Sequence, residues 1–186
     1  MSLNLNALPT DLPVPMDDGA CQHLIGLRLP DIALSTTRGE AINLASIAGW
    51  LVIYCYPMTG RPNVALPKDW DSIPGARGCT PQACSFRDHY QELSALHIQV
   101  FGLSTQTTAY QQEAVARLHL PFALLSDHDL RWTQALHLPT FTVDGQHLNK
   151  RVTLLAKEGV IQHTFYPVFP PDKNVDDVLD WLKQHV

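Results

Sequence analysis

Cysteine, clustered basic residues and long apolar runs are all scarce in this sequence. Of 186 residues only 4 are Cys, and 13 Lys and Arg are scattered among 18 Asp and Glu, which gives a net charge of -5. No stretch approaches the roughly 18 consecutive apolar residues that a membrane-spanning helix needs. No basic patch offers the positive surface on which nucleic acids bind. We therefore expect neither a membrane nor a nucleic acid among the partners.

Several short motifs that carry chemistry are missing as well. The chain has no G-x-S-x-G turn, no phosphate-binding glycine loop, no dinucleotide fingerprint and no H-E-x-x-H pair. Their absence argues against the usual hydrolases, ATPases and nicotinamide-dependent enzymes. The C-x-x-C motif of thioredoxin-type dithiol exchangers is absent too. None of the nine histidines stands in a site pattern, so none is assigned a role.

The first 20 residues lack Lys and Arg and hold no uninterrupted apolar core, unlike a secretory signal. We therefore expect a cytoplasmic protein, in which thiols stay reduced and closely spaced cysteines become candidates for redox or metal chemistry. Residues 1–24 contain three prolines and are predicted to be an extended N-terminal leader. Residues 25–186 are predicted to form one domain.

Strand-like and helix-like patterns alternate along residues 25–186. Stretches rich in β-branched and aromatic residues predict strands, and apolar residues three or four apart predict helices. The predicted strands are 32–34, 41–44, 50–56, 99–103, 122–125, 152–155 and 160–165, and the predicted helices follow Gly78, span 108–118 and 130–136, and end the chain around Val175–Leu182. This order is typical of the α/β class. It predicts a thioredoxin-like fold, with a central mixed sheet and helices on both faces.

A long loop, residues 58–78, joins the predicted strand 50–56 to the helix that follows Gly78. It is longer than most connections inside a compact domain, and such loops are often functional. It starts at the carboxyl end of a buried strand, which is where function gathers in open α/β sheets. Thr80 is expected to cap the helix, and Pro81 to take its first position. The sequence therefore places the candidate site at this loop and helix start.

Two cysteines, Cys79 and Cys84, lie at the start of this helix. Cys79 stands beside the expected helix N-terminus with Arg77 two residues back, and both features stabilise a thiolate. A thiolate that attacks a peroxide becomes a sulfenic acid, which a second thiol can capture. Cys84 suits that second role. Residues five apart on a helix are rotated by about 140° and are too distant for an unstrained bridge, so a disulfide requires the first turns to unwind.

Two other interpretations of this C-x4-C pair stay open from the residues alone. The pair is also consistent with two ordinary buried thiols, or with a metal site that has His89 as a third ligand. Cys55 lies in the middle of an apolar strand and is interpreted as a core residue. Cys21, in the leader, is given no role.

The residues around both cysteines resemble a known family. The stretch GCTPQAC at 78–84, followed by FRD at 86–88, is similar to the Q-type peroxiredoxins, or bacterioferritin comigratory protein family, of the AhpC/TSA superfamily. Weaker likeness extends over nearly the whole chain after the leader, in LPD at 29–31, YCYP at 54–57, GLS at 102–104, LLSD at 124–127 and KRV at 150–152. The resemblance implies a thioredoxin fold and a thiol-dependent peroxidase that reduces hydrogen peroxide and organic hydroperoxides.

The resemblance also implies roles for individual residues. Cys79 matches the family's peroxidatic cysteine and Cys84 its resolving cysteine, and together they form an intramolecular disulfide. Arg151 matches an arginine that stabilises the thiolate and polarises the peroxide, tasks for which a planar, always-charged guanidinium is suited. Further implications are thioredoxin or a glutaredoxin-like protein as reductant, no metal or organic cofactor, and a monomer or weak homodimer. The rival function on the same fold is a non-enzymatic redox sensor or binding protein that switches through the two cysteines.

The loop before Cys79 departs from the family pattern of Pro, three residues, Thr, two residues, Cys. Here Ala76 stands three residues before Cys79, and Pro57 precedes Cys79 by 22 residues rather than seven, an insertion of 15. The hydroxyl that bonds the peroxide and the sulfur is therefore missing from its usual place. Thr59 is expected to fold back and supply this hydroxyl, and the insert is expected to form part of the pocket wall. Two further residues are weaker candidates for the hydroxyl, namely Ser72 and Thr80.

Overall fold

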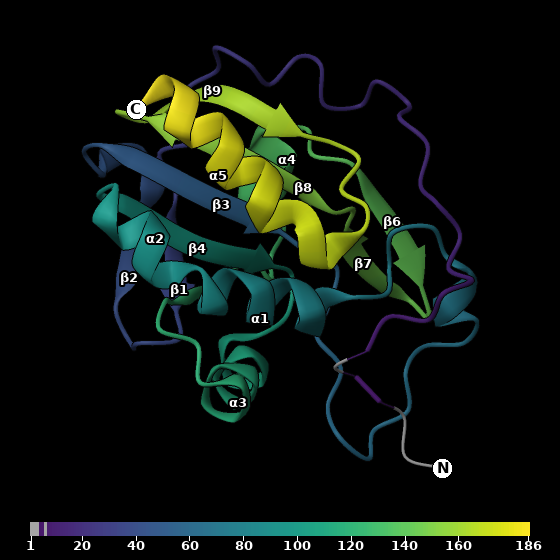
Figure 1. Ribbon diagram of the computed structural model, residues 1–186. Coiled ribbons are helices and arrows are strands. Elements are labelled where there is room, and N and C mark those ends of the chain that lie inside the picture. The colour runs from purple at the N-terminus through teal and green to yellow at the C-terminus, as the bar shows by residue number, and fades with distance from the viewer. Residues whose placement is uncertain (1–3, 6) are drawn as a thin grey trace.

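A seven-stranded sheet forms the centre of the computed structural model, which describes residues 4–5 and 7–186 (Figure 1). The strands lie in the order β2-β1-β5-β4-β3-β8-β9. Their bounds are Ala33–Thr36 for β1, Ala41–Asn43 for β2, Trp50–Cys55 for β3, Ile98–Ser104 for β4, Leu124–Ser126 for β5, Val152–Lys157 for β8 and Val160–Phe165 for β9. Strands β3, β4 and β5 pair in parallel, and the other pairs in the sheet are antiparallel. The sheet is mixed, as the sequence predicts.

Helices cover both faces of this sheet. They are α1 Cys79–Asp88, α2 Tyr90–Ala95, α3 Thr108–Leu118, α4 Arg131–Ala135 and α5 Asn174–His185, with short 3₁₀ turns η1 Leu44–Ser46, η2 Trp70–Ser72 and η3 Pro171–Lys173. Figure 1 shows α1 and α5 in front of the sheet and α4 behind it. This arrangement confirms the predicted α/β, thioredoxin-like fold class. No helix in the described part of the chain is long and apolar enough to cross a membrane.

The two faces of β3 feed two separate apolar cores. Because side chains alternate along a strand, Val52 and Tyr54 pack with α1, α3 and α5, whereas Leu51 and Ile53 pack with α4. The Tyr54 ring stacks on Phe86 of α1, with 4.7 Å between the ring centroids. A stacked aromatic pair of this kind adds about 0.5–1.5 kcal/mol beyond the burial of area. It holds α1 in a defined position over the end of β3.

Helix α1 begins earlier than the sequence predicts. Gly78 precedes it with a φ of 104°, and Cys79 is its first residue, so the expectation that Thr80 caps the helix is wrong. The turn into the helix is made instead by a left-handed backbone, which glycine adopts without strain. A Cβ at position 78 would also collide with Leu8 and Pro171. The predicted single helix is divided into α1 and α2, which begins at Tyr90.

A hairpin that the sequence patterns do not predict packs against the loop 58–78. It consists of β6 Thr140–Val143 and β7 Gln146–Asn149, joined by Asp144 and Gly145 at φ 46° and 74°. Asp-Gly is the turn that two-residue hairpins favour, so this dipeptide is the signal that could have revealed it. Hairpin and loop share a third small core that contains Met58, Trp70, Ala76 and Leu148.

The leader contains no helix or strand in its described part, residues 4–5 and 7–24. Figure 1 shows it, in purple, running outside β6 and on toward β9. Its last residues are packed rather than free, since Cys21 and Leu24 are buried in the core that also holds Ile53. The division of the chain at residue 24 stays a prediction.

Candidate active site

Cys79 occupies the first position of α1, beyond the carboxyl end of β3. Its sulfur is buried, with 4% of the residue exposed, yet it keeps two polar partners. The Arg151 Nη2 atom donates a hydrogen bond to Sγ at 3.2 Å, and the thiol donates to the Ala76 carbonyl oxygen at 3.6 Å. The free N–H groups and the dipole of a helix N-terminus favour negative charge at this position. A guanidinium and a helix N-terminus thus converge on one sulfur.

Arg151 lies directly before β8 and is buried, with a side chain held at several points. Besides the sulfur, Nη2 donates to the carbonyl oxygens of Gly75, Ala76 and Arg77, each at 3.2 Å. These carbonyls belong to the loop that leads into Cys79. A buried cation is costly unless its charge is compensated, and their partial negative charges supply part of that compensation. The structure therefore brings Cys79 and Arg151 together, as the resemblance implies.

A chain of buried side chains extends from Arg151 toward α5, and the sequence analysis missed it. Arg151 Nη1 donates to Gln82 Oε1, and Gln82 Nε2 donates to Asn174 Oδ1 at 3.0 Å. The Thr153 hydroxyl donates to the same Asn174 oxygen at 2.7 Å. The sequence feature that could have pointed to this chain of side chains is Gln82, a glutamine that lies between the two cysteines in the first turns of α1. Gln82 couples the helix that carries Cys79 to the arginine that faces its sulfur.

Cys84 lies on the same helix, half-buried, and both cysteines are free thiols. Burial raises the pKa of Cys84, and the nearby Arg87 guanidinium opposes that shift. Five residues of helix separate the two cysteines by about 7.5 Å of rise and 140° of rotation. Cys79 and Cys84 are thus on one element but not in bonding position.

The Thr59 hydroxyl is hydrogen-bonded to Gln106. Thr59 Oγ1 donates to Gln106 Oε1 at 3.2 Å, the Thr59 backbone N–H donates to the same oxygen at 3.0 Å, and Gln106 Nε2 donates back to the Thr59 carbonyl at 3.2 Å. This clamp ties the start of the 58–78 loop to the end of β4. Among the other candidates, Thr80 lines a small cavity with Cys79. Ser72 lies in η2 and lines a different hollow, together with Asp71 and residues 9 and 11–13. A role for Thr59 at the sulfur stays a prediction.

The loop 58–78 and the leader close over Cys79. A cavity of only about 10 Å³ is lined by Cys79, Thr80, Met58, Leu66 and Leu5, among others. That volume is at the lower limit of the about 10–15 Å³ that a cavity needs to hold one water molecule. A substrate larger than a water molecule reaches the sulfur only if part of this wall moves.

Arg77, the second cation near Cys79 in the sequence, is directed elsewhere. Its Nη1 atom lies 3.2 Å from Asp71 Oδ1, and its Nη2 atom donates to the Asn4 carbonyl at 2.8 Å. Its guanidinium therefore binds the leader to η2 while its own carbonyl accepts from Arg151. Of the two nearby cations, only Arg151 hydrogen-bonds the sulfur within the part of the chain that the structure describes.

His89, the third ligand in the metal interpretation, has other neighbours. Its Nε2 atom lies 3.8 Å from Asp176 Oδ1 and its Nδ1 atom lies 3.0 Å from the Ser85 carbonyl oxygen. Within residues 4–5 and 7–186, no three His, Cys, Asp or Glu side chains are grouped as ligands for a metal ion. The geometry around Cys79 is that of a thiol facing a guanidinium.

Comparisons with known proteins bear on the family and the fold. The family model described as Redoxin matches residues 25–179. Peroxiredoxin Bcp of Escherichia coli is 32% identical over 165 residues, which are 84% of this chain and 93% of that protein. A chloroplastic peroxiredoxin Q of rice is 29% identical over 159 residues, 85% of this chain but only 66% of the rice protein, so the chain spans slightly less than two thirds of that relative.

Solved structures give the same result. The peroxidoxin BcpB of Mycobacterium tuberculosis superposes with a TM-score of 0.69 at 22% identity, over 87% of this chain and 97% of that one. A peroxiredoxin Q of Xanthomonas campestris superposes with a TM-score of 0.63 at 27% identity, over 86% and 97%. The chain belongs to the Redoxin family, as a peroxiredoxin of the Q or Bcp type.

Proposed function

We propose that the chain is a thiol-dependent peroxidase with Cys79 as its nucleophile. The observation that carries this proposal is the Arg151 Nη2 donor at 3.2 Å from the Cys79 sulfur, at the N-terminus of α1. The thiolate attacks the terminal oxygen of a hydroperoxide, the S–O bond forms and the O–O bond breaks. The leaving oxygen takes up a proton and departs as water or an alcohol. Sulfur is oxidised by two electrons and becomes a sulfenic acid.

Arg151 stabilises charge on both reactants. In the resting site it donates to the sulfur, and a peroxide oxygen placed beside the sulfur lies within reach of the same planar donor group. Because the carbonyls of residues 75–77 hold the guanidinium in place, little reorganisation is needed when charge moves from sulfur to oxygen.

Cys84 then resolves the sulfenic acid. Its sulfur attacks the sulfenic sulfur, the S–S bond forms and water leaves. The first turns of α1 must unwind for the sulfurs to meet. Unwinding exposes Cys84, and since burial is what raises its pKa, exposure favours the thiolate at the moment of attack.

A dithiol protein completes the cycle by reducing the disulfide. Thioredoxin or a glutaredoxin-like protein has this chemistry, and the unwound α1 gives it an accessible disulfide. A monomer or weak homodimer and a cytoplasmic location stay predictions, and several plant relatives are chloroplastic proteins.

Two measurements test this function: the turnover of hydroperoxide and the identity of the cysteine that is oxidised. The reduced protein should consume many equivalents of hydroperoxide with thioredoxin, thioredoxin reductase and NADPH, followed by NADPH absorbance. Oxidation that stops after one equivalent would favour the redox-sensor alternative. Mass spectrometry of Cys84→Ser after one equivalent of peroxide should place a dimedone-trapped sulfenic acid on Cys79. Cys21→Ser is the matched control and should turn over like the native protein; trapping on Cys55 or Cys84 of the native chain would overturn the assignment.

A further inference from the structure

The wall over Cys79 is built from two segments that lie far apart in the sequence. One is the loop 58–78, which leads into α1. The other is the start of the leader, residues 4–5 and 7–8, which we call the N-terminal segment. Its Leu5 side chain lines the small cavity beside Cys79. Because that cavity holds at most one water molecule, one of the two segments must move to admit a larger substrate.

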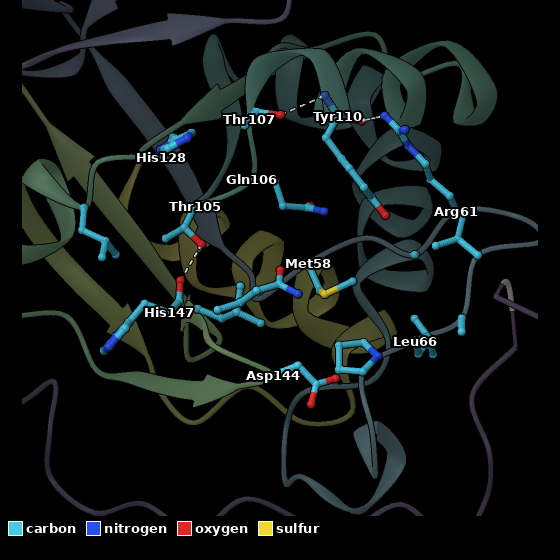
Figure 2. A pocket seen from close by; sticks show the side chains of 17 residues that line it. Met58, Arg61, Leu66, Thr105, Gln106, Thr107, Tyr110, His128, Asp144 and His147 are labelled. Atoms are coloured by element: carbon cyan, nitrogen blue, oxygen red, sulfur yellow. Dashed lines mark hydrogen bonds between the residues drawn. The ribbon is translucent and has the colours of Figure 1, made fainter.

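The first part of the loop 58–78 is braced by β4 and α3. Thr59 and Gln106 share three hydrogen bonds at 3.0–3.2 Å. Figure 2 looks into a cavity of about 660 Å³ between this loop, α3 and the β6–β7 hairpin, and it shows Arg61 of the loop beside Tyr110 of α3. The Arg61 guanidinium lies 3.9 Å from the centroid of the Tyr110 ring. Displacement of this part of the wall would break all of these contacts.

The middle of the loop is held by the β6–β7 hairpin. The Lys68 backbone N–H donates to Asp144 Oδ2 at 3.0 Å. The Trp70 ring packs beside the Phe141 ring, with 6.1 Å between their centroids, in the third small core. Along its length, therefore, the loop is tied to three other elements of the fold.

The N-terminal segment closes the wall with two leucines. Leu5 packs against Gly60, where a Cβ would lie 2.8 Å from Leu5 Cδ2. Leu8 packs against Gly78, where a Cβ would lie 2.7 Å from Leu8 Cδ2. Gly78 is the residue at which the chain turns into α1. One leucine thus closes the cavity beside the sulfur, and the other covers the start of the helix.

Fewer polar contacts tie this part of the leader down than tie the loop. Arg77 Nη2 donates to the Asn4 carbonyl oxygen at 2.8 Å. No backbone-to-backbone hydrogen bond joins residues 7–18 to any other part of the chain that the structure describes. Farther along, the buried side chains of Cys21 and Leu24 anchor the leader. Segments with few buried contacts and few backbone hydrogen bonds open at the lowest free energy, so the N-terminal segment is the weaker side of the wall.

We propose that the N-terminal segment is the gate of the Cys79 site, and that it swings away while the loop 58–78 stays in place. One opening serves two steps of the proposed peroxidase cycle, on which this inference rests. Removal of Leu5 widens the cavity for a hydroperoxide. Removal of Leu8 frees the helix start, which has to unwind before Cys84 reaches the oxidised sulfur. The gate is therefore closed in the reduced protein and open in the disulfide form.

Serine substitutions in the leader test the gate in the reduced protein. Leu5→Ser and Leu8→Ser weaken its apolar contacts, and Leu12→Ser is the matched control, because Leu12 is an equally half-buried leader residue that lines a different hollow. N-phenylmaleimide is too large for the closed cavity. It should label Cys79 at least fivefold faster in Leu5→Ser and Leu8→Ser than in the native protein or the control, by peptide mass spectrometry. Equal rates in all four proteins would overturn the gate, and so would a parallel rise at Cys55, which would mean general loosening of the fold.

Proteolysis tests the gate in the two redox states. Diamide takes one hydrogen atom from each of two thiols, and so makes the Cys79–Cys84 disulfide without any peroxide. Chymotrypsin should then cut after Leu5 or Leu8 at least fivefold faster than in the reduced protein, as followed by intact mass. Cys84→Ser treated with diamide cannot form this disulfide and should be cut at the reduced rate. Equal cleavage of the reduced and disulfide forms would overturn the proposal.

The gate and the peroxidase function fail in different ways. Faster cleavage of the diamide-treated protein, without turnover of hydrogen peroxide or cumene hydroperoxide, would overturn the peroxidase function and support the gate. Turnover of hydroperoxide with equal cleavage in both redox states would support the peroxidase function and overturn the gate.

Discussion

Two buried thiols, Cys79 and Cys55, have nearly the same solvent exposure and opposite surroundings. Cys55 is fully buried at the end of β3, in an apolar core with Leu51 and Ile53, and burial raises its pKa well above the ordinary value. Cys79 is buried at the other face of the same region, but a guanidinium donor lies 3.2 Å from its sulfur and a helix begins at it. Burial alone therefore does not decide reactivity; the groups that replace water around the sulfur do.

Alkylation rates should show the largest contrast between such thiols. Burial, helped by the nearby carboxylates of Asp18 and Asp17, raises the pKa of Cys21 from 9.0 to about 12, and each unit lowers the thiolate fraction at neutral pH about tenfold. Iodoacetamide should therefore label Cys79 of the reduced protein at least ~10³ times faster than Cys21 or Cys55, by peptide mass spectrometry. In urea all four cysteines should react at similar rates. Fast native labelling of Cys55 would break the comparison.

Replacement of Arg151 tests whether its guanidinium is what makes Cys79 more reactive than Cys55. Arg151→Met keeps much of the volume but loses every donor, so we expect kcat/KM for hydrogen peroxide to fall by roughly 10²–10³, the usual cost of losing a donor aimed at developing charge. Stopped-flow tryptophan fluorescence can follow the oxidation step. Lys150→Met, at the neighbouring partly exposed cation, is the control and should react as the native protein does. Equal rates in both variants would place thiolate stabilisation in the helix terminus alone.

Gln82 should have a smaller, positioning effect. Gln82→Met removes the acceptor for Arg151 Nη1, and loss of one hydrogen bond to a charged group, about 1.5–3 kcal/mol, corresponds to a roughly 10- to 100-fold lower kcat/KM. Gln82→Glu keeps an acceptor oxygen for Arg151 but loses the donor to Asn174, so it should restore only part of the rate. Urea unfolding of both variants separates this role from stability. If the Glu variant is as slow as the Met variant, Gln82 does not act by holding Arg151.

Much of this contrast was available from the sequence. The alternation of strands and helices, the C-x4-C pair and the family likeness at residues 78–88 predicted the fold and the position of Cys79, and the likeness at residues 150–152 implied that Arg151 faces its sulfur. Local sequence patterns predict which residues lie on the same helix or strand, because hydrophobic periodicity and conformational propensity are properties of short stretches of sequence.

The remaining parts depend on contacts between distant residues. The hydrogen bond from the Thr59 hydroxyl to Gln106 joins residues 47 apart in sequence, and no local pattern encodes it. The hydrogen-bonded chain from Gln82 to Asn174 spans 92 residues in the same way. The β6–β7 hairpin was missed although its Asp144-Gly145 turn was readable, because Gln146 and His147 interrupt the apolar alternation of its second strand.

Cys55→Ser gives the smallest effect and the sharpest contrast with Cys79. The substitution places a hydroxyl in the apolar core at the end of β3, where loss of its water hydrogen bonds costs about 1–3 kcal/mol unless a partner is found. We expect the free energy of unfolding in urea to fall by that amount while peroxide turnover at 25 °C stays native. Cys79→Ser should do the reverse, with turnover abolished and stability changed by less, since a hydroxyl at position 79 still has the Ala76 carbonyl and Arg151 as partners. If Cys55→Ser also lost turnover, the thiol on the apolar face would belong to the catalytic machinery, and the division between an inert and a reactive buried thiol would not hold.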